Sequence, residues 1–143
     1  MKTHIRSVAT DLLWVLRSVE STPDGDIAWA EHCTRQQAAI VRLNLPRGKV
    51  TSIDVLTEAV GIPIDAVSDI PVNGTAFYTT TGWRIHISSS LSPTDQVWVA
   101  LHELKHIIDN PVRHRAKAEG FSAADFERLA DYFADCVIRE AQP

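Results

Sequence analysis

The chain contains little cysteine and no long apolar or basic run. Cys33 and Cys136 lie far apart and form no C-x-x-C pair, so we expect buried thiols rather than a disulfide framework or a thiolate zinc site. No segment approaches the roughly 20 consecutive apolar residues that cross a bilayer. The N-terminal segment carries His4, Arg6 and Asp11 where a signal peptide would be apolar. We therefore expect a cytoplasmic protein with no membrane association.

The balance of charge and the length of the chain narrow the possible classes further. A formal net charge of -4 without a lysine and arginine run argues against direct nucleic-acid binding as the main function. With 143 residues and 45% hydrophobic content, the chain can form one real core but is too short for two ordinary domains. We expect a single domain over residues 1–143, with N-terminal helices in residues 1–48 and the main core in residues 49–143.

The strongest motif is the pentapeptide HELKH at residues 102–106, which has the form H-E-x-x-H. On a helix, residues four apart lie on the same face, so His102 and His106 can direct their imidazoles at one ion. Glu103 then lies beside them and can accept a proton from a water held by zinc. Because the pentapeptide arises by chance in roughly one chain in a hundred of this length, its surroundings decide its value.

The sequence around the motif predicts a buried helix over residues 93–109. Ser92 and Pro93 form a helix start, and Asn110 followed by Pro111 forms a stop. One apolar stripe lies along this helix, and further apolar residues cover much of its remaining surface, which is typical of a buried helix. The stripe consists of Val97, Leu101, Leu104 and Ile108.

The remaining patterns predict a mostly helical α+β fold. Apolar periodicity and capping residues predict helices over residues 4–20, 26–44, 53–60 and 123–139. Residues 61–64 read as extended chain, and residues 76–78 and 83–88 read as two strands of a hairpin. We expect this small antiparallel hairpin or sheet to pack on the H-E-x-x-H helix, and we expect the two N-terminal helices to serve packing.

A zinc site needs a third protein ligand, and Glu127 is the best candidate. It lies 21 positions after His106, which leaves room for a loop and a returning helix. Ala130 and Ala134 are its neighbours on the helix, where an exposed face would carry long polar side chains. Asp131, one turn further on, can accept a hydrogen bond from a ligand histidine and fix its tautomer.

The order of a hairpin, HELKH and then ERLADYFAD resembles the ImmA/IrrE family of metallopeptidases, in which H-E-x-G-H is followed by E-x-x-A-x-x-F-A. Glu127, Ala130, Phe133 and Ala134 match the second motif, and the resemblance covers roughly residues 50–138. It implies a zincin-like metalloprotease core of the gluzincin type, with one Zn²⁺ per chain. The implied ligands are His102, His106 and Glu127, with Glu103 as the general base.

The resemblance also implies a substrate, and one position of the first motif departs from it. Members of this family cut repressor proteins that carry helix-turn-helix domains, so a transcriptional repressor from a phage, mobile element or stress response is the expected partner. Lys105 stands where the family has glycine. We expect its long cationic side chain to lie beside the metal ligands.

Two further parts of the site are less specified by the sequence. The oxyanion or the substrate needs a hydrogen-bond donor, and the candidates are Tyr78, His86, His114 and Tyr132. The strand at residues 83–88 is expected to offer a free edge to which an extended substrate segment pairs.

Two other functions fit parts of the sequence. A non-catalytic antirepressor would bind a regulatory protein and use zinc only to hold its helices together. A helical DNA-binding factor is prompted by SIDVLTEAVGI at residues 52–62, but the acidic balance and the lack of a basic recognition helix disfavour it.

Overall fold

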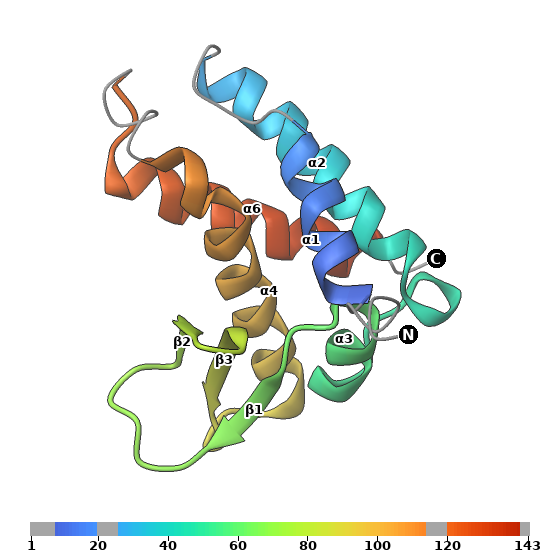
Figure 1. Ribbon diagram of the computed structural model, residues 1–143, viewed down its shortest axis with the longest axis vertical. Helices are drawn as coiled ribbons and strands as arrows, with labels where there is room; N and C mark the ends of the chain where they lie inside the picture. Colours follow the sequence, from blue (N-terminus) through green and yellow to red (C-terminus); the bar gives the residue numbers. More distant parts are fainter. Residues whose placement is uncertain (1–7, 20–25, 114–119, 141–143) are drawn as a thin grey trace.

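A computed structural model describes residues 8–19, 26–113 and 120–140 as five α-helices and one three-stranded sheet (Figure 1). The helices are α1 (Val8–Ser18), α2 (Ile27–Leu43), α3 (Ile53–Val60), α4 (Pro93–Asp109) and α6 (Ala123–Glu140). The strands are β1 (Ile64–Val67), β2 (Gly74–Thr79) and β3 (Gly82–Ser88), and short 3₁₀ turns cover Pro46–Gly48 and Asn110–Val112. The predicted α+β class is confirmed. Within the described ranges, none of the helices combines the length and the apolar character that a membrane span needs.

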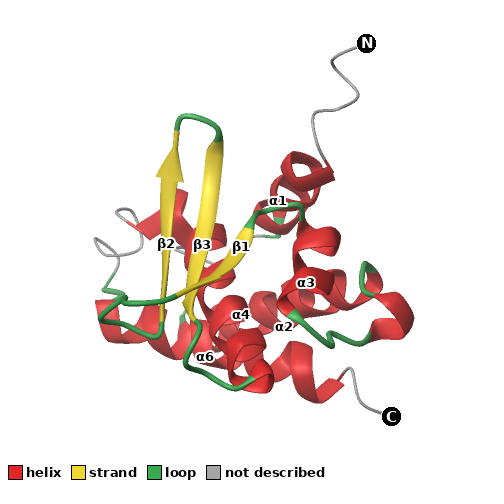
Figure 2. Ribbon diagram, turned by 90° about the horizontal axis from the view of Figure 1, so that it is seen from below, coloured by secondary structure: helices red, strands yellow, loops and turns green. Residues whose placement is uncertain are grey.

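The sheet has the strand order β1-β3-β2, which corrects the predicted topology (Figure 2). β2 pairs with β3 as the expected antiparallel hairpin, but β1 adds a parallel strand on the other side of β3, with Ile64 opposite Ile85. The prediction that residues 83–88 form a free edge is therefore wrong, because β3 lies between two partners. The edge strands are β1 and β2.

The sheet packs on α4 through the side chains of β3. Ile85 and Ile87 are fully buried in the same core as Leu101 and Leu104 of α4. Gly74, at the start of β2, allows a close approach, because a Cβ at this position would lie 2.5 Å from Cγ1 of Val99. β2 is therefore held directly against the helix that carries the H-E-x-x-H motif.

α4 lies at the centre of the molecule, between the sheet and α6 (Figure 1). The predicted stripe of α4 is buried, and Phe133 and Val137 of α6 are buried in the same core. Side chains of α1 and α2, among them Leu16 and Val41, also belong to it. The N-terminal helices thus share one core with the motif helix.

The helix ends follow the capping residues of the sequence. Ser92 Oγ accepts a hydrogen bond from the Asp95 N–H, and Ser52 Oγ accepts one from the Val55 N–H. Gly61 ends α3 with φ of 72°, a left-handed conformation that favours glycine. The four later helices begin and end within one residue of their predicted bounds, and part of the predicted helix over residues 4–20 lies outside the described residues.

Lys105 points away from His102 and His106, contrary to the expectation drawn from the resemblance. Its side chain is fully buried, and its Nζ donates to Oδ1 of Asp109 at 2.7 Å and to Oε1 of Gln37 at 2.8 Å. Asp109 lies one turn further along α4 and Gln37 lies in α2, so the ammonium group faces the N-terminal helices. Arg17 of α1 reaches the same region and donates from Nη2 to the Ile107 carbonyl oxygen at 2.6 Å.

Candidate metal centre

His102 and His106 lie one turn apart on α4 and direct their Nε2 atoms at each other, 3.2 Å apart. Each side chain is 14% exposed, so the two imidazoles are mostly buried but remain in contact with solvent. The rings meet edge to face with centroids 4.8 Å apart. This arrangement leaves both Nε2 atoms facing one small space beside the helix.

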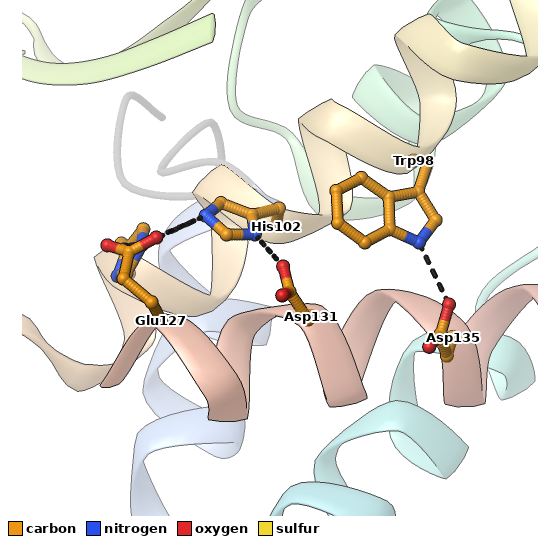
Figure 3. Close-up of polar contacts among 6 residues, drawn as sticks. Trp98, His102, Glu127, Asp131 and Asp135 are labelled. Atoms are coloured by element: carbon orange, nitrogen blue, oxygen red, sulfur yellow. Dashed lines mark hydrogen bonds and ion pairs between the residues drawn. The ribbon is translucent and has the colours of Figure 1, made fainter. Parts of the chain in front are cut away.

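Glu127 of α6 closes this space from the other side. Its Oε1 lies 3.0 Å from His102 Nε2, as Figure 3 shows. Its Oε2 lies 3.0 Å from His106 Nε2. The carboxylate side chain is 58% exposed, so one side of the group is open to solvent. Two imidazoles and one carboxylate, from two helices, therefore converge within 4.8 Å of one another.

The separations among these three groups fit a tetrahedral zinc ion. Bonds of about 2.0–2.1 Å to a tetrahedral zinc place its ligand atoms about 3.3 Å apart. The observed separations are 3.2 Å between the imidazole nitrogens and 3.0 Å from each nitrogen to the carboxylate. Two histidines and one glutamate are also a ligand set that catalytic zinc sites use, with the fourth position left for water or substrate.

Asp131 fixes the orientation of His102. Its Oδ1 lies 2.8 Å from His102 Nδ1, and Figure 3 shows the two side chains facing each other between α6 and α4. A carboxylate accepts hydrogen bonds, so this contact favours the tautomer of His102 that carries its proton on Nδ1. In that tautomer the Nε2 lone pair can bind a cation that lies between His102 and Glu127. His106 lacks such support, because its buried Nδ1 has no hydrogen-bond partner among the described residues.

Replacing Asp131 by alanine is expected to weaken zinc binding about 10- to 100-fold, because His102 loses the group that orients its ring. Competition with a chromophoric zinc chelator measures the change. Asp54→Ala is the control, because it removes an exposed aspartate on α3, which carries none of the three converging side chains. Equal zinc affinity of Asp131→Ala and Asp54→Ala would show that Asp131 does not support His102.

Trp98 forms a wall beside His102, with ring centroids 5.5 Å apart. Its Nε1 donates to Oδ1 of Asp135 at 2.9 Å, as Figure 3 shows. Glu127, Asp131 and Asp135 thus form a row of acids on one face of α6, each contacting α4. The row fixes the axial position of α6 against the motif helix.

Glu103 lies half-buried between the two histidines and the edge of the sheet. Burial raises the pKa of Glu103 above its ordinary value, and the neighbouring His106 and His102 lower it in part. Glu127 raises the pKa further, while a hydrogen bond from the backbone N–H of Ala76 lowers it. The carboxylate therefore has an increased proton affinity, which suits a group that must take up a proton.

The hydrogen bond from the Ala76 N–H to Glu103 could not be predicted from the sequence, because every residue except proline carries a backbone N–H. The strand register explains why this N–H does not pair with β3. Ala76 pairs with Ile85, and the Ile85 N–H donates to the Pro63 carbonyl oxygen on the β1 side. The pair is therefore not hydrogen-bonded across the hairpin, and the Ala76 N–H points away from β3 toward Glu103.

Three of the predicted oxyanion or substrate donors lie in the described part of the chain, and none of them lies beside Glu103 and the two histidines. His86 lies on the sheet face opposite Ile85 and Ile87, with its ring against Phe77. The hydroxyl of Tyr132 accepts from Arg35 on the α2 side of α6. Tyr78 packs on Trp83 in a groove lined by α1, and His114 lies outside the described residues.

Among protein families, residues 57–138 match the Peptidase M78 family, described as the IrrE N-terminal-like domain. The matched segment covers more than half of the chain and contains His102, Glu103, His106 and Glu127. No curated protein and no solved structure matches the chain.

Proposed function

Because the chain belongs to the IrrE N-terminal-like family of metallopeptidases, we propose that it is a zinc-dependent endopeptidase of the gluzincin type. The observation that carries the proposal is the convergence of His102, His106 and Glu127 within 4.8 Å of one another. Each chain would hold one Zn²⁺. A transcriptional repressor is the proposed substrate, on the strength of the family resemblance.

The residues around the three ligands support hydrolysis of a peptide bond. When bound, zinc supplies a Lewis acid that polarises a carbonyl and makes water a stronger nucleophile. Glu103 takes the proton of the attacking water and delivers it to the leaving amine, and its raised pKa favours this uptake. Asp131 keeps the Nδ1 proton on His102 throughout, so that Nε2 remains a ligand.

The outer edge of β2 supports binding of an extended substrate. By the alternation of antiparallel pairs, the backbone groups of Gly74, Ala76 and Tyr78 point away from β3. This edge runs beside Glu103, because the Ala76 N–H donates to its carboxylate. A peptide that pairs with the edge would therefore lie next to the proposed metal centre. Main-chain pairing of this kind gives affinity for many extended sequences.

Tyr78→Pro tests the edge, because it removes an outward backbone donor without removing a hydrogen bond of the hairpin. We expect kcat/KM to fall about tenfold, the equivalent of one hydrogen bond. Tyr78→Ala is the matched control, since it removes the same side chain but keeps the N–H. Both variants are compared by thermal unfolding. If Tyr78→Pro folds and cleaves as well as Tyr78→Ala, the substrate does not pair at this position.

Metal content and cleavage together test the proposed function. The purified protein is expected to hold one zinc per chain, and Glu127→Ala is expected to lose it, because two histidines alone bind zinc weakly. Glu31→Ala, which removes a carboxylate paired with Arg128 at the surface of α2 and α6, is expected to keep the metal. Elemental analysis measures both.

Cleavage is measured with a library of unstructured peptides, by mass spectrometry of the products. The zinc-loaded protein should cut internal peptide bonds, a chelator should stop the reaction, and added zinc should restore it. Zinc at full occupancy in Glu127→Ala would remove Glu127 from the ligand set. A zinc-loaded protein that cuts neither these peptides nor a helix-turn-helix repressor would contradict the peptidase assignment.

A further inference from the structure

A cavity of about 260 Å³ lies between α2 and α6, and three of its six lining residues are arginines. This concentration of positive charge is unusual on a chain whose formal net charge is -4. The lining residues are Arg35, Arg42, Tyr132, Asp135, Cys136 and Arg139.

The cavity is separate from the proposed metal centre formed by His102, His106 and Glu127. α6 turns Glu127 and Asp131 toward α4, whereas Tyr132 and Cys136 contact α2. α2 and α6 pack against each other (Figure 1). The cavity therefore lies on the other side of α6 from the proposed metal centre.

Two of the arginines donate hydrogen bonds to neutral groups of α6. Arg35 Nη1 donates to the hydroxyl of Tyr132 at 2.8 Å, and Arg42 Nη1 donates to the carbonyl oxygen of Cys136 at 2.9 Å. Among the described side chains, neither Arg35 nor Arg139 takes part in an ion pair. Asp135 is the one acid of the lining, and its Oδ1 accepts from Trp98 Nε1. The lining therefore contains three guanidinium groups and one carboxylate.

Helix ends explain only part of this charge. Arg42 and Arg139 lie in the last turns of α2 and α6, where cations interact favourably with the helix dipole. Arg35 lies in the middle of α2 and gains nothing from a helix end. Arg35 is exposed and donates to a neutral hydroxyl. Glu31, the acid that acts on Arg35, is itself paired with Arg128, so the guanidinium group of Arg35 can still bind an anion.

We propose that this cavity binds a phosphate group carried by a small molecule. Guanidinium groups are planar forks that bind phosphate oxygens in pairs, and several of them are needed to balance a dianion. The Tyr132 hydroxyl accepts from Arg35, which leaves its own proton to donate to a phosphate oxygen. The volume lies just below the roughly 300–1,000 Å³ of drug-sized sites, so the ligand is a phosphate or a small phosphomonoester.

Isothermal titration calorimetry with two probes tests the proposal on the zinc-loaded full chain at constant ionic strength. Inorganic phosphate and glycerol 3-phosphate distinguish the free ion from a phosphomonoester. We expect one site with a Kd of about 1 mM or tighter for at least one of them. Arg35→Gln is expected to weaken this binding at least about tenfold, whereas Arg35→Lys, which keeps the charge but not the fork, should weaken it less.

Two controls separate this cavity from other sources of phosphate binding. Arg84→Gln removes an arginine of β3 that pairs with Asp65 outside the cavity, and it should leave the affinity unchanged. Glu127→Ala should also retain phosphate binding, which distinguishes the cavity from the metal centre, so this proposal stands or falls independently of the peptidase assignment. Thermal unfolding checks that each variant is folded.

Three results would overturn the proposal. They are the absence of saturable binding of both probes, equal affinity of Arg35→Gln and the unchanged chain, and loss of binding in Glu127→Ala with retention in Arg35→Gln. Binding of an acidic peptide without any response to the two phosphate probes would assign the cavity to a macromolecular partner instead.

Discussion

Replacing Glu103 by glutamine is expected to lower the rate of peptide hydrolysis about 10²- to 10⁴-fold while zinc stays bound. Glutamine keeps the size of the side chain and can still contact the Ala76 N–H, but it cannot take up a proton. Because Glu103 is not one of the three converging side chains, we expect the metal content to remain one zinc per chain. The expected signature is a loss in kcat that exceeds any change in KM.

The measurement is single-turnover cleavage of a peptide identified from the library, together with elemental analysis of each variant. Glu58→Gln makes the same chemical change at an exposed position of α3 and should leave the rate unchanged. Glu103→Gln also distinguishes a peptidase from a non-catalytic antirepressor. A Glu103→Gln protein that still relieves repression in a reporter strain, without cleaving its partner, would favour the non-catalytic function.

The second large effect is expected on stability, at Lys105. Lys105→Ala should lower the free energy of unfolding by about 3–5 kcal/mol, because it removes the cation that forms a direct ion pair with the buried Asp109 carboxylate. Oδ2 of Asp109 already has no hydrogen-bond partner among the described residues, so the variant leaves both oxygens unsatisfied. Gln37 Oε1 also loses its donor.

Chemical denaturation measures the change, and a double variant isolates its cause. Lys105→Met with Asp109→Leu removes both charges and keeps the volume apolar, so it should be much less destabilised than Lys105→Ala. Lys49→Ala, at an exposed position, should change the free energy of unfolding by no more than about 0.5 kcal/mol. If the single and double variants lose equal stability, lost packing rather than the unpaired carboxylate is responsible.

The sequence predicts features that depend on local spacing. Helix bounds follow from capping residues such as Ser52 and Ser92, which act on their own first turn. The grouping of His102 with His106 follows from the helical repeat. Glu127 could be singled out because small residues beside it indicate a helix that approaches another closely, and the structure places it against both histidines.

Features that depend on distant partners could not be predicted in this way. β1 is only four residues long. Its parallel pairing joins Ile64 to Ile85, and β2 lies between these two residues in the sequence. The direction of Lys105 is set by Gln37, which is 68 positions away in the sequence. The direction of the Ala76 N–H depends on the strand register. The pattern of side chains does not predict which backbone N–H groups point away from β3.

The link between Lys105 and Gln37 bears on where this protein can be divided. The segment that matches the family begins at residue 57, whereas Gln37, Leu16 and Val41 lie before it. Gln37 Nε2 also donates to the Leu16 carbonyl oxygen at 3.1 Å, so α1, α2 and α4 are joined by one buried polar chain. A fragment cut at the family boundary would open the ammonium group and its apolar surroundings to water, and the shortest independently stable unit therefore extends back to α1.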